Sequence, residues 1–470
     1  MNPVDRFFEI SARHSTVSDE VRGGVVTFIA MAYIIVLNPI ILSGTEDVSG
    51  NKLDFAQVSA TTSLAAGVMT LLFGLFTRLP FAFAAALGIN SFLATTVVGS
   101  VTWPEAMGLV VINGLIIMLL AITGLRRLVF DAVPMQLKLA ITSGIGLFIL
   151  FIGLVDAGFI GSTGVASPPV GLGSDGLGSI STVPTLIFVL TLLLTTILVA
   201  RQVRGSLLIG LVAGTVVAVV IEAIWHLGSA TDRPGGWRLS VPAFSGSPFA
   251  WPDLSLVGEL SLNSFSRIGM LATIMLVFTL VFANFFDAMG TLTGLSREAG
   301  LSDDRGTFPR LRSALIVEGA GAVVGGATSS SSTTVFIESG AGIEEGARTG
   351  LANLVTGALF LAAMFVSPIA SIVPSEVAAA ALVVVGAMMA SHLRHIDLSE
   401  FSVALPVVLT VAVMPFSYSI ANGIGVGFIT WAVLRTAAGK AREVSPLLWV
   451  VAAGFAVYFA RAPIESLIGS

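Results

Sequence analysis

Two neighbouring stretches decide the fold: VFANFFDAMGTLTG (281–294) and, after a basic loop, EGAGAVVGGATSSSSTTVFIESGAGIEEGARTG (318–350). Asp287 and Glu338 each lie within apolar sequence that otherwise has the composition of a membrane span. A carboxylate at the centre of a span costs about 2.5–3.5 kcal/mol on insertion scales, so it predicts a functional site. The Ser and Thr residues before Glu338 favour an extended segment that leads into a short helix. Interrupted helices of this kind form substrate sites in secondary transporters, because the start of a half-helix presents unpaired N–H groups and the positive end of its dipole.

The composition places the chain in a membrane. Of its 470 residues 55% are hydrophobic and 11% are charged, and the mean hydropathy is +0.96. A soluble domain carries about 25% charged residues. The chain has no Cys, which excludes disulfides and thiol chemistry. No basic stripe indicates nucleic acid, and no motif indicates a metal, a cofactor or an enzyme's nucleophile and base.

A membrane-crossing helix needs about 20 mostly apolar residues. This requirement identifies fourteen candidate spans, so we expect an all-α polytopic membrane protein. The candidates cover residues 23–43, 56–77, 81–99, 105–125, 135–155, 182–200, 206–226, 269–294, 313–328, 331–346, 349–369, 374–391, 401–416 and 418–437. A further apolar segment, 446–461, is short, and the sequence leaves open whether it crosses.

The basic residues orient these spans. If all fourteen cross, most of the 23 Lys and Arg residues fall in loops on the side of the N-terminus. Cytoplasmic loops collect such residues. We therefore expect a multi-pass protein of the cytoplasmic membrane with a cytoplasmic N-terminus. Lys138, near the inner end of the fifth span, is expected to extend its ammonium group to the interface.

The third and tenth spans share one irregularity. The third runs through small residues to Gly88, Ile89 and Asn90, and the tenth begins with hydroxyl side chains and reaches Glu338. If seven spans repeat after seven, these two are counterparts of opposite orientation. Paired interrupted segments of this kind indicate a transporter site at the repeat interface. We therefore expect a 7+7 inverted repeat with short extended segments in spans three and ten.

Seven stretches of the chain together resemble one family. They are TFIAMAYIIVLNP (27–39), GINSF (88–92), TGLRRLVFDAVPMQLKLAITSGIGLFILFIGL (123–154), FFDAMGTLTG (285–294), FIESGAGIEEGARTGL (336–351), MPFSYSIANGI (414–424) and GKAREVSPLL (439–448). With these motifs, the chain resembles the AzgA-like adenine, guanine and hypoxanthine permeases of the nucleobase/cation symporter-2 family, which are nucleobase–ascorbate transporter-like. The resemblance covers nearly the whole chain.

The resemblance implies proton symport of a purine nucleobase through an elevator-like motion of a core domain against a gate domain. The family's substrate-site acids fall on Asp287 and Glu338, and the asparagine of its third span falls on Asn90. Four positions depart from the family pattern, namely Ala85 and Ala86 before the third half-helix, Asn113 in the fourth span, and Phe336 two residues before Glu338. They leave the preferred purine open.

The same resemblance divides the chain into segments. These are a cytoplasmic N-terminus (1–22), core spans 1–4 (23–130), gate spans 5–7 (131–226), an extracytoplasmic loop (227–268), core spans 8–11 (269–370), gate spans 12–14 (371–437) and a C-terminal segment (438–470). We expect no cofactor, and the sequence leaves open whether the protein forms a homodimer.

A purine is flat and edged with hydrogen-bond donors and acceptors, so each site residue has an expected role. The carboxylates of Asp287 and Glu338 would accept hydrogen bonds from its N–H groups. Phe286 or Phe336 would stack on its face, and Thr334 and Asn90 would contact its edge. Because burial disfavours a charged carboxyl, either acid could bind the coupling proton. We expect Glu338 to bind the base and Asp287 to take the proton.

Each residue also has an ordinary structural explanation. The two acids could satisfy backbone N–H groups at the broken helices. Asn90 could cap a helix, the phenylalanines could be packing residues, and Thr334 could serve the backbone at the break. Glu318, in the ninth span, is expected to be a core hydrogen-bond partner rather than a ligand.

Other functions remain as alternatives. A transporter of the same fold could carry uracil, xanthine or an inorganic anion, although two acids would repel an anion. A passive channel would not need a titratable pair within an inverted repeat. The sequence also leaves open whether protons or Na⁺ drive transport.

Overall fold

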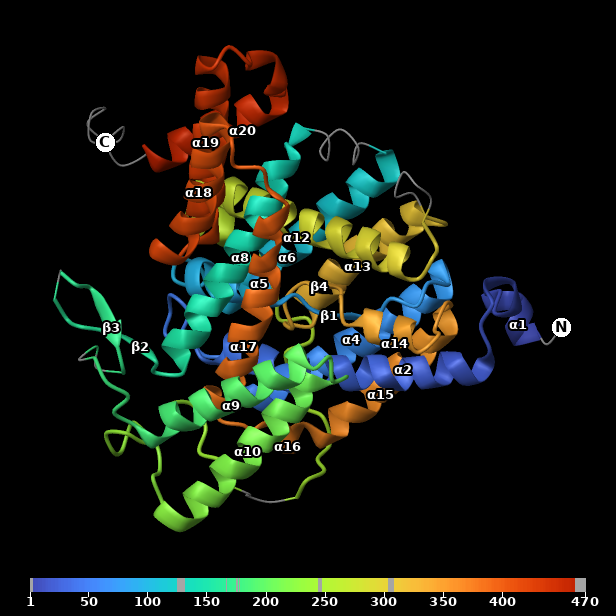
Figure 1. Cartoon of the computed structure of the whole chain (residues 1–470), viewed down its shortest axis with the longest axis vertical. Coiled ribbons are helices and arrows are strands. Elements are labelled where there is room, and N and C mark those ends of the chain that lie inside the picture. The colour runs from blue at the N-terminus through green and yellow to red at the C-terminus, as the bar shows by residue number, and fades with distance from the viewer. Residues whose placement is uncertain are drawn as a thin grey trace.

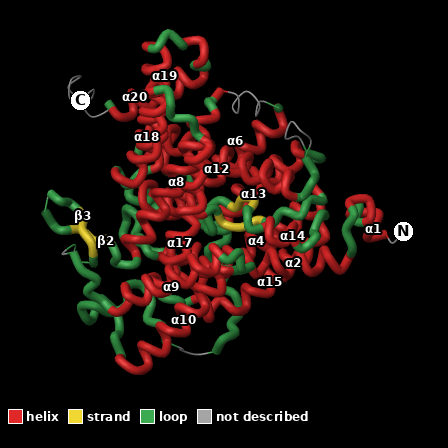
Figure 2. Tube along the Cα trace, in the orientation of Figure 1, coloured by secondary structure: helices red, strands yellow, loops and turns green. Residues whose placement is uncertain are grey.

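The computed structural model describes residues 3–124, 132–165, 167–174, 176, 178–243, 247–302 and 308–460. Helices dominate (Figures 1 and 2). The longer helices are α2 (Val17–Met31), α3 (Ile34–Ser43), α4 (Phe55–Thr77), α6 (Trp103–Thr123), α8 (Met135–Asp156), α9 (Val183–Ala200), α10 (Ser206–Trp225), α12 (Met270–Glu298), α13 (Leu311–Ala327), α15 (Gly350–Ala363), α17 (Ser375–Ala390), α18 (Phe401–Phe416), α19 (Ile420–Ala437) and α20 (Pro446–Phe459). The shorter elements include α1 (Pro3–Phe8), α5 (Leu87–Phe92), the π-helix η2 (Leu93–Val97), α11 (Ser264–Arg267), α14 (Ser339–Glu344) and α16 (Ser367–Ala370).

Ten helical segments within the described residues are long and apolar enough to cross a membrane, and α18 and α20 are shorter apolar helices. Each expected span coincides with one or more of these helices, or with a strand and a short helix for spans three and ten. The expected boundary between spans four and five, at 130–131, lies outside the described residues. Within the expected segment 446–461, α20 covers Pro446–Phe459, and its 14 residues would extend only about 21 Å.

Polar caps explain where several helices begin. The side chains of Thr16, Asp54, Thr182, Thr349 and Ser445 each accept a hydrogen bond from a backbone N–H in the first turn of the following helix. Such caps satisfy N–H groups that have no partner within the helix. The apolar runs therefore start as helices at positions that the local sequence encodes.

The first expected span is divided into α2 and α3, which meet at Ala32 and Tyr33. Pro39 lies inside α3 and cannot donate to the carbonyl of Ile35. The hydroxyl of Ser59 donates to that carbonyl instead, at 3.1 Å. A partner from a neighbouring helix is how membrane proteins tolerate a proline inside a span.

The helices pack in two groups. In one group, α6 packs on α13, α15 packs on α4 and α2, and α14 packs on α2. In the other, α17 packs on α8 and α9, α18 packs on α8 and α19, and α9 packs on α10. Figure 1 shows α2, α4 and α14 on the right and α18, α19 and α20 at the upper left. Helix α12 contacts both groups, since it packs on α6 as well as on α8, α19 and α20.

Two strand pairs interrupt the helical architecture (Figure 2). Strands β1 (Phe83–Ala85) and β4 (Thr333–Val335) pair near the centre of the molecule. Strands β2 (Ile160–Ser162) and β3 (Val170–Leu172) form an antiparallel pair at its edge. The apolar runs of the sequence do not predict β2 and β3, because these strands lie in a Gly- and Ser-rich connection.

The long connection at 227–268 lies over helix ends. The N–H of Gly258 donates to the carbonyl of Ala327, at the end of α13. The N–H of Ser261 donates to the carbonyl of Pro104, at the start of α6. Trp237 is fully buried and donates to the carboxylate of Glu222 at 2.8 Å.

Candidate transport site

The expected extended segments of spans three and ten pair with each other. Strands β1 and β4 are antiparallel, with Phe83 opposite Val335 and Ala85 opposite Thr333. Two more backbone bonds lengthen the pair, from Ala86 to the carbonyl of Ser332 at 2.8 Å and from Phe336 to the carbonyl of Ala82 at 2.9 Å. These bonds satisfy backbone groups that a bare break would leave unpaired inside the protein.

Two glycines of α13 make room for β4. A Cβ on Gly325 would lie 1.8 Å from the carbonyl oxygen of Ser331, and one on Gly321 would lie 2.7 Å from that of Thr333. The spacing of these glycines predicts close helix packing. Gly321 and Gly325 instead make their close contact with the extended segment that contains β4. Gly210 and Gly214, which have the same spacing, do pack against a helix, since their Cβ positions meet threonines of α9.

A short helix follows each strand. Helix α5 starts after Ala86, and α14 starts after Glu338; neither start has a side-chain cap. Helix α12 contacts β4 and both short helices. Asp287, in the middle of α12, therefore lies where the two interrupted spans meet.

Asp287 and Glu338 lie near each other. Their carboxylates are close enough to interact electrostatically, and both side chains are partly accessible. Ile337 beside them is 53% exposed, although Phe286 and Phe336 are buried. The two expected acids therefore lie near each other at the break, and each is partly accessible.

Tyr33 is a partner of Glu338 that the sequence analysis missed. Its hydroxyl donates to Oε1 of Glu338 at 2.5 Å, and its side chain is fully buried. The break between α2 and α3 places it there. Phe336 has no hydroxyl to offer Glu338, and Tyr33 supplies one from another span.

Glu318 braces the extended segment, as its expected structural role requires. Its Oε2 accepts a hydrogen bond from the N–H of Val335 at 3.3 Å. Glu318 is also close enough to Asp287 for their charges to interact. Thr334 is buried within β4. Its part in binding a ligand stays a prediction.

Asn90 belongs to a buried polar cluster. Its Nδ2 donates to Oδ1 of Asn38 at 2.5 Å, and Nδ2 of Asn38 donates to Thr62 at 2.7 Å and to the carbonyl of Ser330 at 3.0 Å. Among the described residues, Oδ1 of Asn90 has no hydrogen-bond partner. Asn90 is fully buried, and its contact with a ligand stays a prediction.

Lys138 does not extend to the interface as expected. It is only 9% exposed, and its ammonium group lies 5.6 Å from the ring centroid of Phe286. The physical reason is that α8 packs on α12, which directs the side chain inward to an aromatic face. Lys138 and Phe286 therefore form a contact between the two helix groups.

A cavity of about 460 Å³ lies beside α5, and neither Asp287 nor Glu338 is among its lining residues. Its lining includes Ser91 and Thr95 after β1, Asp156 at the end of α8, Arg238 in the long connection, and Tyr418 before α19. Arg238 donates to the carbonyl of Val155 at 2.8 Å and interacts with the charge of Asp156. The cavity lies between the two helix groups, beside the short helix that follows β1.

Sequence comparison assigns this arrangement to a family. The sequence model of the permease family matches residues 18–426. The chain belongs to the permease family. The resemblance to AzgA-like purine permeases is confirmed, and the protein is a transporter rather than an enzyme.

Two curated relatives are similar to this permease over nearly their full length. Adenine permease AdeP from Escherichia coli strain K12 is 34% identical over 452 residues, which cover 96% of this chain and 94% of that protein. Guanine/hypoxanthine permease PbuG from Bacillus subtilis strain 168 is 35% identical over 462 residues, which cover 96% of this chain and 98% of that protein.

A solved structure shares the fold. The transmembrane domain of the cyanobacterial bicarbonate transporter BicA superposes on this permease with a TM-score of 0.62 and 17% identity, covering 86% of this chain and 97% of that one. At this identity the similarity shows the fold alone. The permease is thus an all-helical membrane protein of the architecture that BicA represents.

Proposed function

We propose that this permease takes up purine nucleobases, namely adenine, guanine or hypoxanthine, by proton symport. The observation that carries the proposal is the pair of partly accessible acids, Asp287 and Glu338, at the meeting point of two broken spans. The relatives named adenine permease and guanine/hypoxanthine permease support the substrate class.

The groups at the break match the edge of a purine. Carboxylates accept from the ring and exocyclic N–H groups, and the backbone at the short-helix starts supplies donors. Phe286 and Phe336 are aromatic neighbours of the two acids. A purine analogue that lacks a matching donor or acceptor would leave a buried polar group of the site unpaired. The free-energy cost of that unpaired group discriminates strongly against the analogue. Two carboxylates at one site would repel an inorganic anion, so the likeness to BicA extends to fold and not to substrate.

Glu338 and Asp287 are expected to have different roles in transport. Glu338 is held by Tyr33 and lies at the start of a half-helix, which suits it to bind the base. Asp287 lies in the middle of α12 and interacts electrostatically with Glu338 and Glu318. Burial and the neighbouring carboxylate of Glu338 disfavour its charged form, which suits it to the coupling proton.

The architecture proposed for this work has fourteen spans in a 7+7 inverted repeat with a cytoplasmic N-terminus. The antiparallel pairing of β1 with β4 supports the repeat. We assign the helix group of α2, α4, α6, α13, α14 and α15 to the core, and the group of α8, α9, α10, α17, α18 and α19 to the gate. Transport would then be an elevator-like movement of the core, with its bound base, against the gate.

A labelled-uptake experiment tests the substrate and the coupling. Hypoxanthine uptake by cells that express the permease should be suppressed by excess adenine or guanine and much less by uracil. A protonophore should abolish accumulation, and removal of Na⁺ should not. Accumulation that persists with the protonophore but requires Na⁺ would overturn proton coupling, and competition by uracil alone would overturn the purine assignment.

An ion pair between the groups provides a test of the proposed motion. Arg204, in the turn between α9 and α10, pairs with Glu345 at the end of α14 and lies 3.9 Å from a carboxylate oxygen of Glu344. Arg22 of α2 also pairs with Glu345, at 2.7 Å. One partner of Glu345 therefore belongs to the gate and the other to the core.

Cysteine pairs at these positions should distinguish the two partners, because the chain contains no Cys of its own. Cross-linking Arg204→Cys to Glu345→Cys with a short bismaleimide should reduce uptake at least about tenfold, since the core could no longer move against the gate. Cross-linking Arg22→Cys to Glu345→Cys is the matched control and should leave most uptake intact. Equal uptake after both cross-links would contradict the elevator-like motion.

A further inference from the structure

Two hollows that are lined in part by arginines lie apart from the proposed transport site. One, of about 520 Å³, is lined by Phe7, Leu75, Phe76, Arg78, Arg310 and Ser313. The other, of about 400 Å³, is lined by Pro3, Arg6, Phe7 and Arg78. The two share Phe7 and Arg78 and so adjoin at that pair; together we call them the Arg78 hollow.

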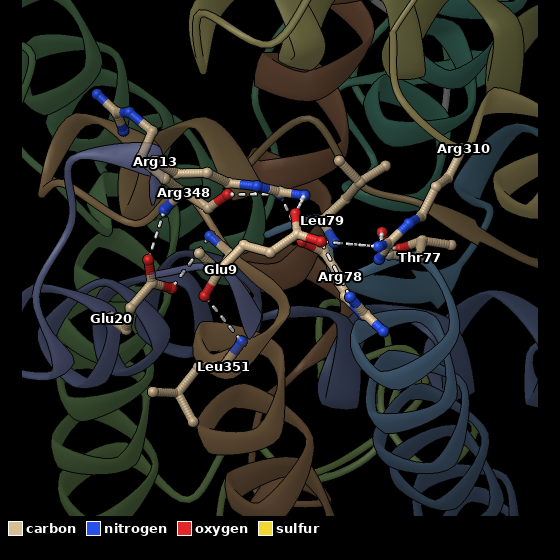
Figure 3. Close-up of polar contacts among 10 residues, drawn as sticks. Glu9, Arg13, Glu20, Thr77, Arg78, Leu79, Arg310, Arg348 and Leu351 are labelled. Carbon is tan, nitrogen blue, oxygen red and sulfur yellow. Dashed lines mark hydrogen bonds and ion pairs between the residues drawn. The ribbon is translucent and has the colours of Figure 1, made fainter. Parts of the chain in front are cut away.

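The N-terminal segment builds this hollow by binding to the ends of distant helices. Figure 3 shows Glu9 between Arg13, Arg78 and Arg310. Glu9 accepts a hydrogen bond from each of these arginines at 2.9 Å. Arg13 in turn donates to the carbonyls of Arg78 and Arg348. Helix α1 is therefore fixed against the ends of α4, α13 and α15.

The lining is basic despite the presence of Glu9. Burial alone would raise the pKa of the Glu9 carboxyl, but the hydrogen bond and charge of Arg13, with contributions from Arg310 and Arg78, bring the pKa below its usual range. An ionised Glu9 offsets one guanidinium charge. The residues that line the hollow include three arginines and, within the described chain, no acid.

Arg78 and Arg310 each have more guanidinium N–H donors than they use in hydrogen bonds to the described residues. Each guanidinium carries five N–H donors. Among the described residues, Arg78 uses one of its nitrogens for Glu9, and Arg310 uses two for Glu9 and the carbonyl of Thr77. The guanidinium of Arg78 also lies 4.6 Å from the centroid of the Phe7 ring. Remaining N–H groups of this kind match the oxygens of a phosphate.

The other half of the hollow is apolar and exposed. Phe76 is 66% exposed, Phe7 is 42% exposed and Leu75 is 41% exposed. Leu75 and Phe76 belong to the last turn of α4, one of the segments apolar enough to cross a membrane. If α4 crosses the membrane, as its length and composition allow, the basic half lies just beyond the end of a span, where acyl chains give way to head groups, and the apolar half faces the acyl chains.

We propose that the Arg78 hollow binds an anionic phospholipid, with its phosphate against Arg6, Arg78 and Arg310 and its acyl chain against Leu75, Phe76 and Phe7. Basic pockets at the membrane surface recognise lipid phosphates in this way. A soluble phosphate would use the arginines and leave the apolar half exposed. The exposed apolar half therefore favours the lipid as occupant.

Native mass spectrometry of the purified full-length permease tests the proposal. The probes are phosphatidylglycerol, phosphatidylcholine with the same acyl chains, and inorganic phosphate. Wild-type permease should retain phosphatidylglycerol over phosphatidylcholine. The double variant Arg6→Gln and Arg78→Gln should weaken phosphatidylglycerol binding roughly 30-fold, as expected for two basic residues near a lipid surface.

Matched variants keep this test decisive. Arg201→Gln with Arg442→Gln removes two exposed arginines that are not part of the hollow, and should retain phosphatidylglycerol as wild type does. If the double variant elutes as aggregate, Arg6→Gln alone is used, because Arg6 is exposed and outside the Glu9 cluster. Equal retention of both lipids, undiminished binding by the variant, or displacement of phosphatidylglycerol by millimolar inorganic phosphate would each overturn the proposal.

Discussion

Replacing Glu338 with alanine is expected to reduce the initial rate of purine uptake at least about 30-fold, with little change in the amount of protein in the membrane. Truncating one partner of a buried charged hydrogen bond costs about 2–5 kcal/mol, and each 1.4 kcal/mol corresponds to a factor of ten. The loss falls on the bound state, because Glu338 and Asp287 meet at the break where the base is proposed to bind. Labelled hypoxanthine uptake, normalised to transporter abundance, measures the effect.

Three further variants separate binding from folding. Glu338→Gln keeps the volume and one acceptor, so its uptake should lie between those of wild type and the alanine variant. Tyr33→Phe removes only the hydroxyl that donates to Glu338 and should lower uptake roughly tenfold. Glu46→Gln changes an exposed acid that pairs with Lys52, and should behave as wild type. Normal uptake by Glu338→Ala would remove Glu338 from the site.

Gly325→Ala is the second substitution with a large expected effect. The added Cβ would lie 1.8 Å from the carbonyl oxygen of Ser331. No rotamer relieves this clash, because both atoms belong to or adjoin the backbone. Strand β4 must therefore shift away from α13, which moves Thr334 and Glu338 together. We expect uptake to fall at least about tenfold, since small displacements of site groups reduce transport of a tightly matched base.

A glycine at an ordinary contact serves as the control for this effect. A Cβ on Gly454, in α20, would meet its nearest heavy atom at 3.5 Å. Gly454→Ala should therefore transport normally and be slightly more stable, since alanine favours a helix. Thermal unfolding of both variants shows whether Gly325→Ala acts only by unfolding the protein. Wild-type uptake by Gly325→Ala would contradict the role assigned to the contact between α13 and β4.

The sequence identifies Asp287 and Glu338 as candidate site residues because a charge in an apolar run is energetically conspicuous. Asp287 and Glu338 stand out in any hydropathy reading, and the hydroxyl run before Glu338 indicates the break. Asn90 was predictable as a polar residue in an interrupted span. Its pairing with Asn38 was not, since nothing local shows which of several buried polar side chains lie together.

The contacts of Tyr33 and Lys138, by contrast, could not be predicted from the sequence. Tyr33 lies in an apolar stretch where an aromatic residue is ordinary, and only the break between α2 and α3 directs its hydroxyl to Glu338. Lys138 lies at the expected end of a span, where a basic side chain normally extends to water. Its burial over Phe286 depends on how α8 packs against α12. Both contacts join residues far apart in the chain, so no local pattern encodes them.

The sequence by itself determined the membrane class, the apolar helical segments, the two interrupted segments and the two acids within them. It could do so because transferring a segment into a membrane has a free energy that depends mainly on that segment's own composition. Only the tertiary structure decided which partners meet at the break: β1 with β4, Glu338 with Tyr33, and Gly325 with Ser331. These contacts depend on the shape and packing of whole helices, which the composition of any single segment does not specify.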